Sequence, residues 1–388
     1  MPNIFQIILP ALLAFIGTLW IHPKVLKISI DKGLLDNPNE RKLQRKPTPV
    51  MGGIAVFFGI LIGACYSQAL FKNPNAFMLV SAMAVMLYIG AIDDILGLTP
   101  SIRFAIEIFV VCWLMYASSL SLNCFWGLWG LWNIPTYIAY PLTVFSCVGI
   151  INSINLIDGV NGLSSGFCFM ASTLFAIIFY KSGDYTMMTI AISAAGAIIP
   201  FFLHNVIGNN TKMFIGDSGT LVIGIMMSMF VMSIIDQNSN NHILALKGVG
   251  LVAFTVAVLA IPIFDTIRVM STRILHGTSP FRPDKTHLHH IFIELGFSHV
   301  GTTVCILTLN FLIVVTWFIS YQLGASADLQ LYIVMAMGIC FTFGLYHYSS
   351  ILLKKGGWGL KVLQKISKLL YIEKKGFWSN MQNLIDKI

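Results

Sequence analysis

Charged residues are scarce in this chain: they make up 10% of its 388 residues, whereas a soluble domain carries about a quarter. Hydrophobic residues make up 56%, and the mean hydropathy is +0.80. The sequence also lacks a polar stretch long enough to form a separate soluble domain. These absences exclude a soluble enzyme, argue against nucleic-acid binding, and predict a polytopic membrane protein.

Long apolar runs supply the predicted fold. Runs of about 18 or more residues can cross the ~30 Å hydrocarbon core of a bilayer as helices. The fold is therefore predicted to be all-α, a transmembrane bundle of about eleven helices near residues 4–22, 51–70, 76–92, 104–122, 135–151, 163–180, 186–203, 218–235, 246–264, 302–322 and 330–348. The first run has no basic segment before it and no convincing cleavage site, so we expect a retained span.

The chain also lacks paired cysteines. None of the seven cysteines has Cys-x-x-Cys spacing, and almost all lie inside apolar runs. This pattern favours a packing role over redox or zinc chemistry.

Positive charge is distributed unevenly between the predicted connections. If the spans alternate, one face carries 21 of the 24 Lys and Arg residues, and the other has only Lys72, Lys181 and Lys247. The positive-inside rule then predicts an external N-terminus and a cytoplasmic C-terminus. We divide the chain into a transmembrane catalytic domain, residues 1–350, and a basic amphipathic cytoplasmic tail, residues 351–388, expected to lie on the membrane lipids.

The first of three acidic motifs on the predicted cytoplasmic face is Asp93-Asp94, at the end of an apolar run. Adjacent helical positions diverge by about 100°, so the two carboxylates are expected to have different partners. One would face a metal or substrate, while the other would cap a helix or pair with Arg103. A plain helix cap or ion pair is the alternative for either residue alone.

The second motif places Asn155, Asp158 and Asn161 three residues apart, with glycines between and after them. This spacing predicts one face of a helical turn, and the glycines would let the backbone approach a ligand closely. The motif has the chemical character of a phosphate- or metal-binding loop. Asn-Gly and Asp-Gly pairs are also ordinary turn formers, which is the alternative interpretation.

The third motif, Gly216-Asp217-Ser218-Gly219, opens a predicted span, so Asp217 is expected near a helix N-terminus, which favours anions. A simple helix cap is the alternative. Three oxygen-rich clusters at helix ends on one face predict a hard cation held together with substrate phosphates. Mg²⁺ fits best, with Mn²⁺ as an alternative and zinc disfavoured.

A long cytoplasmic connection, residues 276–290, contains two prolines and four histidines. Connections of this length are more often functional than not. Its imidazoles, together with Arg282, suit binding of a diphosphate. Zinc binding through the histidines is the competing interpretation, although no cysteine or carboxylate accompanies them at ligand spacing.

The motif set resembles the polyprenyl-phosphate N-acetylhexosamine-1-phosphate transferases, in particular the undecaprenyl-phosphate GlcNAc-1-phosphate transferase group. That family includes enzymes that begin O-antigen, enterobacterial common antigen and teichoic-acid linkage units. The match runs from about residue 36 to residue 297, through Lys46-Pro-Thr-Pro-Val-Met-Gly-Gly53, Asp93-Asp94, Asn155-Leu-Ile-Asp158-Gly159, Gly216-Asp217-Ser218-Gly219 and Ser279-Pro-Phe-Arg-Pro-Asp284-Lys-Thr-His287-Leu-His289-His290.

The resemblance implies a Mg²⁺-dependent transfer of a sugar-1-phosphate, most simply GlcNAc-1-phosphate, from a UDP-N-acetylhexosamine to undecaprenyl phosphate. The products are undecaprenyl-diphospho-sugar and UMP, which begins a cell-surface polysaccharide. Asp217 and Asp93 are implied as metal ligands, and Asp93, Asp94 and Asp158 as catalytic groups. Substrate contacts are implied for Lys46, Arg103, Asn155, Asn161, Arg282, His287, His289 and His290.

Several alternatives stay open. Many relatives carry an aspartate where this chain has Asn161, and a neutral amide cannot act as a base.

An enzyme similar to phospho-MurNAc-pentapeptide translocase is one alternative function, and a secondary transporter is another, since acids inside membranes often mark transport pathways. The resemblance also implies the bacterial inner membrane with a cytoplasmic active site, and leaves a homodimer open.

Overall fold

The computed structural model describes residues 4–38, 47–281, 284–371 and 377–387. Ten of its helices are long and apolar enough to cross a membrane, or eleven if one bent pair counts as a single span. The prediction of an all-α bundle of about eleven transmembrane helices is therefore confirmed, and the chain is a multi-pass membrane protein.

The straight spans are α1 (Ile4–Asp31), α2 (Gly52–Phe71), α3 (Pro74–Leu96), α4 (Pro100–Ser118), α5 (Thr136–Leu156), α6 (Leu163–Ser182), α7 (Tyr185–Val206), α8 (Gly216–Ile235) and α13 (His299–Gln322). The last span joins α14 (Ala327–Ile339), the π-helical turn η1 (Cys340–Gly344) and α15 (Leu345–Lys355). Shorter elements are β1 (Leu35–Asp36), β2 (Thr48–Pro49), β3 (Cys124–Leu128), β4 (Leu131–Asn133), α9 (His242–Leu246), α12 (Leu288–Glu294), α16 (Trp358–Leu369) and α17 (Phe377–Ile385).

The helix α8 forms the centre of the bundle, and every residue from Ser218 to Ile235 is buried. Helices α2, α3, α5, α6 and α10 all pack against it. Because α8 is apolar on all sides, it can be buried completely. The outer helices instead present large apolar side chains on their exposed surfaces, as helices in contact with lipid do.

One expected span is broken in the structure. The predicted run 246–264 becomes α10 (Leu251–Val258) and α11 (Ala260–Leu275), which are bent by 72°. Pro262 has no N–H to donate to the carbonyl of Val258. The Asn310 side chain on α13 compensates: its Nδ2 donates to the Val258 carbonyl at 3.0 Å, and its Oδ1 accepts from the Ile261 N–H at 2.9 Å. A buried helix break is tolerated where such a partner is supplied.

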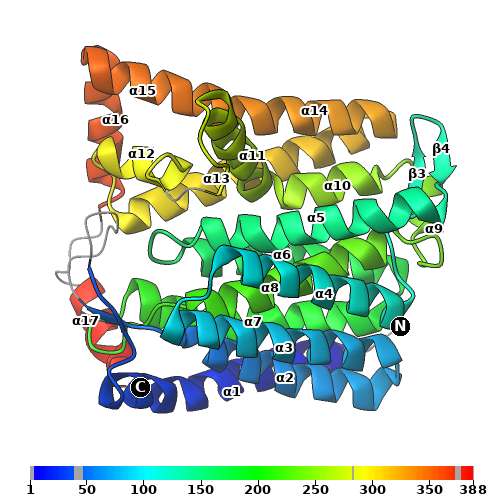
Figure 1. Cartoon of the computed structure of the whole chain (residues 1–388), viewed down its shortest axis with the longest axis horizontal. Helices are drawn as coiled ribbons and strands as arrows, with labels where there is room; N and C mark the ends of the chain where they lie inside the picture. Colours follow the sequence, from blue (N-terminus) through cyan, green and yellow to red (C-terminus); the bar gives the residue numbers. More distant parts are fainter. Residues whose placement is uncertain (1–3, 39–46, 282–283, 372–376, 388) are drawn as a thin grey trace.

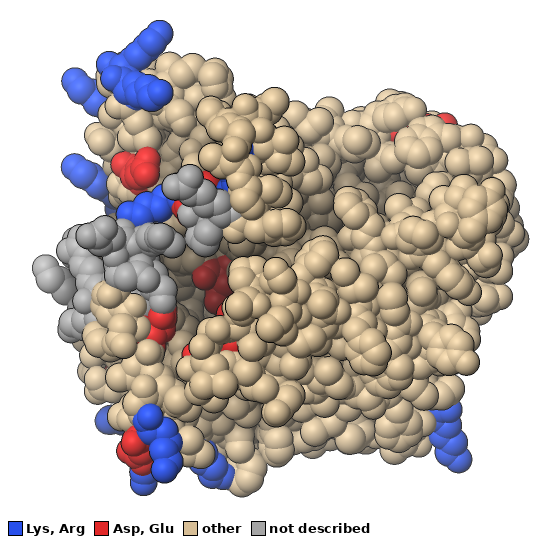
Figure 2. All heavy atoms as spheres, in the orientation of Figure 1, with Lys and Arg blue, Asp and Glu red and all other residues tan. Residues whose placement is uncertain are grey.

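The two ends of the bundle differ in composition. Figure 1 shows α12, α16 and α17 at one end, and the β3–β4 hairpin with α9 at the other. Lys and Arg side chains gather mainly at the first end in Figure 2, which also shows Asp and Glu side chains inside a hollow beside them. The three acidic motifs all reach this charged end, as the sequence predicts.

Candidate active site

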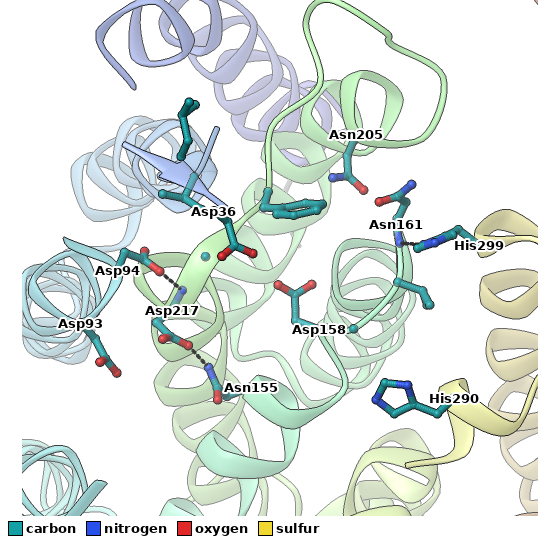
Figure 3. A pocket seen from close by; sticks show the side chains of 16 residues that line it. Asp36, Asp93, Asp94, Asn155, Asp158, Asn161, Asn205, Asp217, His290 and His299 are labelled. Atoms are coloured by element: carbon teal, nitrogen blue, oxygen red, sulfur yellow. Dashed lines mark hydrogen bonds between the residues drawn. The ribbon is translucent and has the colours of Figure 1, made fainter. Parts of the chain in front are cut away.

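A cavity of about 450 Å³ opens at the charged end of the bundle. Five of its lining side chains are carboxylates, and they come from four separate segments that the fold brings together, since Asp93 and Asp94 are neighbours on α3 (Figure 3). The lining residues are Leu35, Asp36, Val50, Asp93, Asp94, Asn155, Asp158, Gly159, Val160, Asn161, Asn205, Phe214, Gly216, Asp217, His290 and His299. All three acidic motifs and the histidine segment therefore meet around a single space.

The N-terminus of α8 binds an anion, but the anion belongs to the protein itself. The Asp94 carboxylate accepts a hydrogen bond from the N–H group of Asp217 at 2.8 Å (Figure 3) and another from the N–H group of Ser218 at 3.0 Å. A helix N-terminus favours a negative charge at this position. Asp94 thus fixes the start of α8 and the direction in which Asp217 faces the cavity.

Two glycines, one on α2 and one on α3, allow α8 to begin close to both helices. A Cβ added at Gly53 would lie 2.1 Å from the backbone nitrogen of Gly219, and one at Gly90 would lie 2.5 Å from the backbone of Ser218. Small residues allow membrane helices to approach backbone to backbone. The position of Asp217 therefore depends on the absence of a side chain at both Gly53 and Gly90.

The Pro-Thr-Pro-Val-Met-Gly-Gly motif positions the same loop. The backbone of Phe214 donates to the Pro49 carbonyl at 2.8 Å, and the Phe214 carbonyl accepts from Gly52 at 2.9 Å. The next pair continues this ladder, because Gly53 donates to the carbonyl of Ile215 at 2.8 Å. Lys46, which the resemblance makes a substrate contact, lies outside the described residues.

Arg103 connects two of the motifs. Its guanidinium lies 3.3 Å from Asp93 and 3.9 Å from Asp217, and it donates to the Asn155 side chain at 3.4 Å. Asp93 also caps the end of α3 by accepting from the Leu98 N–H at 2.7 Å. The prediction that the two neighbouring aspartates divide their contacts is confirmed: Asp93 caps and pairs with Arg103, whereas Asp94 contacts α8.

Glu107, one turn after Arg103 on α4, is 1% exposed and was not predicted as a site residue. Its carboxylate lies 3.4 Å from the Arg103 Nε and accepts from the Asn152 amide. Asn155 in turn donates to Asp217, so the acidic and amide side chains form one continuous network around Arg103. A buried acid with such partners supports the orientation of the guanidinium.

The cavity is lined by all three polar residues of the second motif, Asn155, Asp158 and Asn161. They do not share one face of a helix, although the sequence predicts that they do. Helix α5 ends at Leu156, so the last two residues lie in a turn. At one of the glycines the space is already taken by the protein. A Cβ at Gly159 would lie 2.0 Å from the Nε2 of His289, so this glycine makes room for an imidazole of the protein.

The three predicted histidines have different surroundings. His287 is buried, and its Nδ1 lies 2.9 Å from the Asp265 carboxylate on α11. His289 is buried against Gly159. Only His290 of the three lines the cavity (Figure 3).

An ion pair shapes the connection before the histidines. Arg273 contacts both oxygens of Asp284, at 2.9 and 3.0 Å, and its remaining nitrogen donates to the Pro280 carbonyl. The same carboxylate accepts from the Thr286 hydroxyl at 2.6 Å. Arg282, the predicted diphosphate contact in this connection, lies outside the described residues.

Two cavity side chains have shifted pKa values. Enclosure by protein atoms raises the pKa of Asp158 to about 6, although the Ser164 hydroxyl, which donates to it at 2.5 Å, acts in the opposite direction. Burial, followed by the neighbouring His287, lowers the pKa of His290 to about 4. Near neutral pH, the cavity therefore has a neutral imidazole opposite several carboxylates.

Five residues of the site were not predicted from the sequence, namely Asp36, Glu107, Asn205, Asp265 and His299. Asp36 and His299 carried a weak signal, since each borders a segment already singled out. Glu107 lies inside a predicted apolar run and Asp265 directly follows one, and an acid at such a position indicates a functional or structural partner because its burial is costly. Asn205 is an amide at a helix end, and nothing local distinguishes it from an ordinary cap.

The donor set fits a hard divalent cation. Among the residues described, no three His, Cys, Asp or Glu side chains form a metal cluster by themselves. Mg²⁺ commonly needs only one or two carboxylates together with substrate phosphates. The Asp217 side chain, which is 32% exposed at the cavity, provides such a carboxylate. No zinc-like cluster is present in the described histidine segment.

Comparison with known proteins agrees with this geometry. The model of glycosyl transferase family 4 matches residues 76–235, which include Asp93, Asp158 and Asp217. The probable undecaprenyl-phosphate N-acetylglucosaminyl 1-phosphate transferase of Bacillus subtilis (strain 168) is 27% identical over 311 residues, 80% of this chain and 84% of the relative. The undecaprenyl-phosphate alpha-N-acetylglucosaminyl 1-phosphate transferases of Yersinia pestis and Escherichia coli (strain K12) are each 28% identical over 282 residues, 70% of this chain and 73% and 72% of those relatives. The resemblance drawn from the five motifs is thereby confirmed.

Proposed function

We propose, from the match of residues 76–235 to glycosyl transferase family 4 and from relatives that extend over most of the chain, that this protein is a membrane glycosyl-1-phosphate transferase. It transfers a sugar-1-phosphate from a UDP-N-acetylhexosamine, most simply UDP-GlcNAc, to undecaprenyl phosphate. The products are undecaprenyl-diphospho-sugar and UMP. One observation carries the proposal: the residues of all three acidic motifs and His290 line one cavity at the charged end of the bundle.

In the reaction one phosphorus–oxygen bond forms and one phosphorus–oxygen bond breaks. An oxygen of the lipid phosphate attacks the β-phosphorus of the nucleotide sugar, and the bond from that phosphorus to the bridging oxygen breaks, so that UMP leaves with the oxygen. A phosphate monoester is largely dianionic at neutral pH, so a strong base is not required. Alignment of the two phosphates and neutralisation of their charge matter more.

The chain's own residues suit these tasks. Arg103 holds Asn155 and Asp217 in one network beside the cavity. His290, neutral near pH 7, offers an N–H to a phosphate oxygen from the opposite wall. Asp93 and Asp94 act mainly by fixing Arg103 and the start of α8, and Asp158 faces the cavity from the turn after α5.

We also propose a Mg²⁺ requirement, because five carboxylates around the cavity would repel a diphosphate unless a cation accompanied it. Asp217 would be the principal ligand, with Asp93 beside it across Arg103. When bound, the cation would neutralise charge that develops on the phosphate oxygens. Mn²⁺ is the natural substitute to test.

The setting follows from the same residues. We place the cavity on the cytoplasmic side of a bacterial inner membrane, because 21 of the 24 Lys and Arg residues belong to the connections predicted to lie there. A transporter is less well supported, since transporter sites lie near the bilayer midplane, whereas Asp94, Asn155 and Asp217 lie at helix ends. Assembly as a homodimer stays a prediction.

The test is a transfer assay with the purified protein in lipid nanodiscs, undecaprenyl phosphate, Mg²⁺ and a panel of UDP-sugars. We expect UMP release and a lipid-linked sugar with UDP-GlcNAc, and neither after chelation of the metal. UDP-MurNAc-pentapeptide, assayed in parallel, distinguishes the translocase-like alternative. Absence of UMP with every nucleotide tested, from a protein that remains folded, would contradict the proposal.

A further inference from the structure

We propose that the C-terminal helix α17 is a positioning element of the active site, and that Asp386 anchors the α7–α8 connection that leads into Asp217. The expected effect on kcat rests on the proposed transferase function, whereas the expected effect on the backbone of residues 209–217 does not. The contact joins the end of the chain to the connection of residues 207–215, about 175 residues earlier. Figure 1 shows α17 at the same end of the bundle as α12 and α16, the charged end at which the cavity opens.

One carboxylate oxygen of Asp386 makes four contacts with this connection. It accepts from the N–H groups of Asn209 at 2.9 Å, Asn210 at 3.2 Å and Thr211 at 3.4 Å. It also accepts from the Thr211 hydroxyl at 2.9 Å. Successive backbone N–H groups that converge on one anion form a nest, a strong and directional site for a negative charge. This tail aspartate therefore fixes the backbone of three consecutive residues.

The electrostatics agree with a persistent contact. Partial burial acts to raise the pKa of Asp386, but the hydrogen bonds from Asn209 and Thr211 outweigh it, so the pKa lies below its usual value. The group is consequently ionised across the physiological range and can only accept. Ile385, the preceding residue, is 5% exposed, so the end of α17 is packed as well as hydrogen-bonded.

The contact continues into the bundle through Thr211. Its hydroxyl proton is directed to Asp386, so its oxygen accepts from the Nδ1 of His204 at 2.9 Å. Its carbonyl accepts from the Nε2 of His22 at 3.0 Å. The two imidazoles are buried and stacked, with ring centroids 4.3 Å apart. Tail, connection and two transmembrane helices are thereby joined at one residue.

The adjacent side chain on α7 reaches the cavity. Asn205 follows His204 in the sequence and lines the pocket (Figure 3). Its Oδ1 accepts from the Gly162 N–H at 2.7 Å, and its Nδ2 donates to the Met213 carbonyl at 2.8 Å. It therefore holds the turn that carries Asp158 and the connection that carries Phe214. A displacement of residues 209–211 would reach both indirectly, through the contact of Thr211 with His204 and through the chain that leads to Met213.

The test uses the full-length protein in nanodiscs and compares Asp386→Ala and Asp386→Asn with Asp386→Glu. Asp328→Ala is the matched control, because Asp328 also accepts from a backbone N–H, that of Trp129 at 2.6 Å, at the opposite end of the bundle. We expect Asp386→Ala to lower kcat about tenfold through misalignment of the site, with a smaller effect on KM. Asp386→Glu should recover most of kcat, and Asp328→Ala should stay within twofold of the parent.

Hydrogen–deuterium exchange supplies a readout that does not depend on activity. We expect faster exchange at residues 209–217 in Asp386→Ala and Asp386→Asn, with no change near residues 124–133. An unchanged kcat and unchanged exchange would overturn the proposal, as would equal losses in the Asp328 control or a failure of glutamate to rescue. If the parent protein transfers no sugar, the proposed function fails, and exchange at residues 209–217 alone decides the role of Asp386.

Discussion

The two ends of α8 each carry an aspartate, and the two aspartates differ in what their oxygens contact. Asp217, in the first turn, faces a cavity, accepts from the Asn155 amide and lies 3.9 Å from the Arg103 guanidinium. Asp236, just after the last turn, is fully buried, and its two oxygens accept from Ser121, Asn123 and Asn238. One acid therefore retains capacity for a ligand, whereas the other is saturated by the protein.

This difference shows how an acid at a helix end should be interpreted in a membrane protein. Both residues follow or precede a long apolar run, and both are costly to bury. At Asp236 the cost is offset by three donors from nearby loops, and the result is a structural junction under the β3–β4 hairpin. At Asp217 the Arg103 guanidinium and the Asn155 amide offset part of the cost, while the neighbouring carboxylates add to it, so a cation or substrate in the cavity would complete its partners.

The largest effect should come from replacing the aspartate at each end of α8 by asparagine, which exchanges one carboxylate oxygen for an amide nitrogen. Asp217→Asn should reduce turnover by about 10³-fold or more, because an amide is a poor ligand for a hard cation. Asp236→Asn should leave turnover within twofold but lower Tm by a few degrees, since an amide cannot accept with both of its heavy atoms. Transfer assays and thermal unfolding in the same nanodiscs measure both, and similar losses of activity in the two variants would refute the comparison.

A smaller effect should come from the guanidinium that connects the motifs. Arg103→Gln leaves Glu107 buried without its cationic partner and should cost about 3 kcal/mol of stability and about 10²-fold in activity. Adding Glu107→Gln should restore most of the stability but not the activity. If the double variant recovers both, Arg103 serves the fold alone.

The smallest expected effect is a change in pH dependence. Because the pKa of Asp158 is raised to about 6 in the folded protein, its neutral form stabilises the fold below the unfolded-state pKa, and this contribution is lost as the pH rises through about 6. Asp158→Asn should therefore raise Tm at pH 7.5 relative to the parent, with little difference at pH 4, while reducing turnover. A lower Tm for the variant at pH 7.5 would show that the ionised carboxylate stabilises the protein.

Much of the architecture could be predicted from the sequence, because lipid-facing helices need long apolar runs and these are visible without any knowledge of packing. The meeting of Asp93, Asn155 and Asp217 at one end also followed from the alternation of spans. The break at Leu259 was missed because it depends on two helices. Pro262 leaves the Val258 carbonyl without its helical donor, and Asn310 on α13 supplies the replacement hydrogen bond.

The site residues that were missed share a different cause. Glu107 and Asp265 contact predicted residues from outside the cavity lining, and Asn205 lines the cavity while it contacts the backbones of Gly162 and Met213. These roles exist only once separate segments are packed together. The motif also could not show which histidine borders the cavity, because it places His287, His289 and His290 close in sequence without fixing their surroundings. Contacts to Lys46 and Arg282 remain predictions.

The glycines packed around the site have a practical consequence for mutagenesis. A methyl group at Gly53, Gly90 or Gly159 would overlap backbone or imidazole atoms of the site at 2.0 to 2.5 Å. Saturation libraries should accordingly return inactive clones at positions that carry no reactive group whatsoever. For this enzyme, we expect the positions that do not tolerate substitution to include these tightly packed glycines as well as the reactive residues.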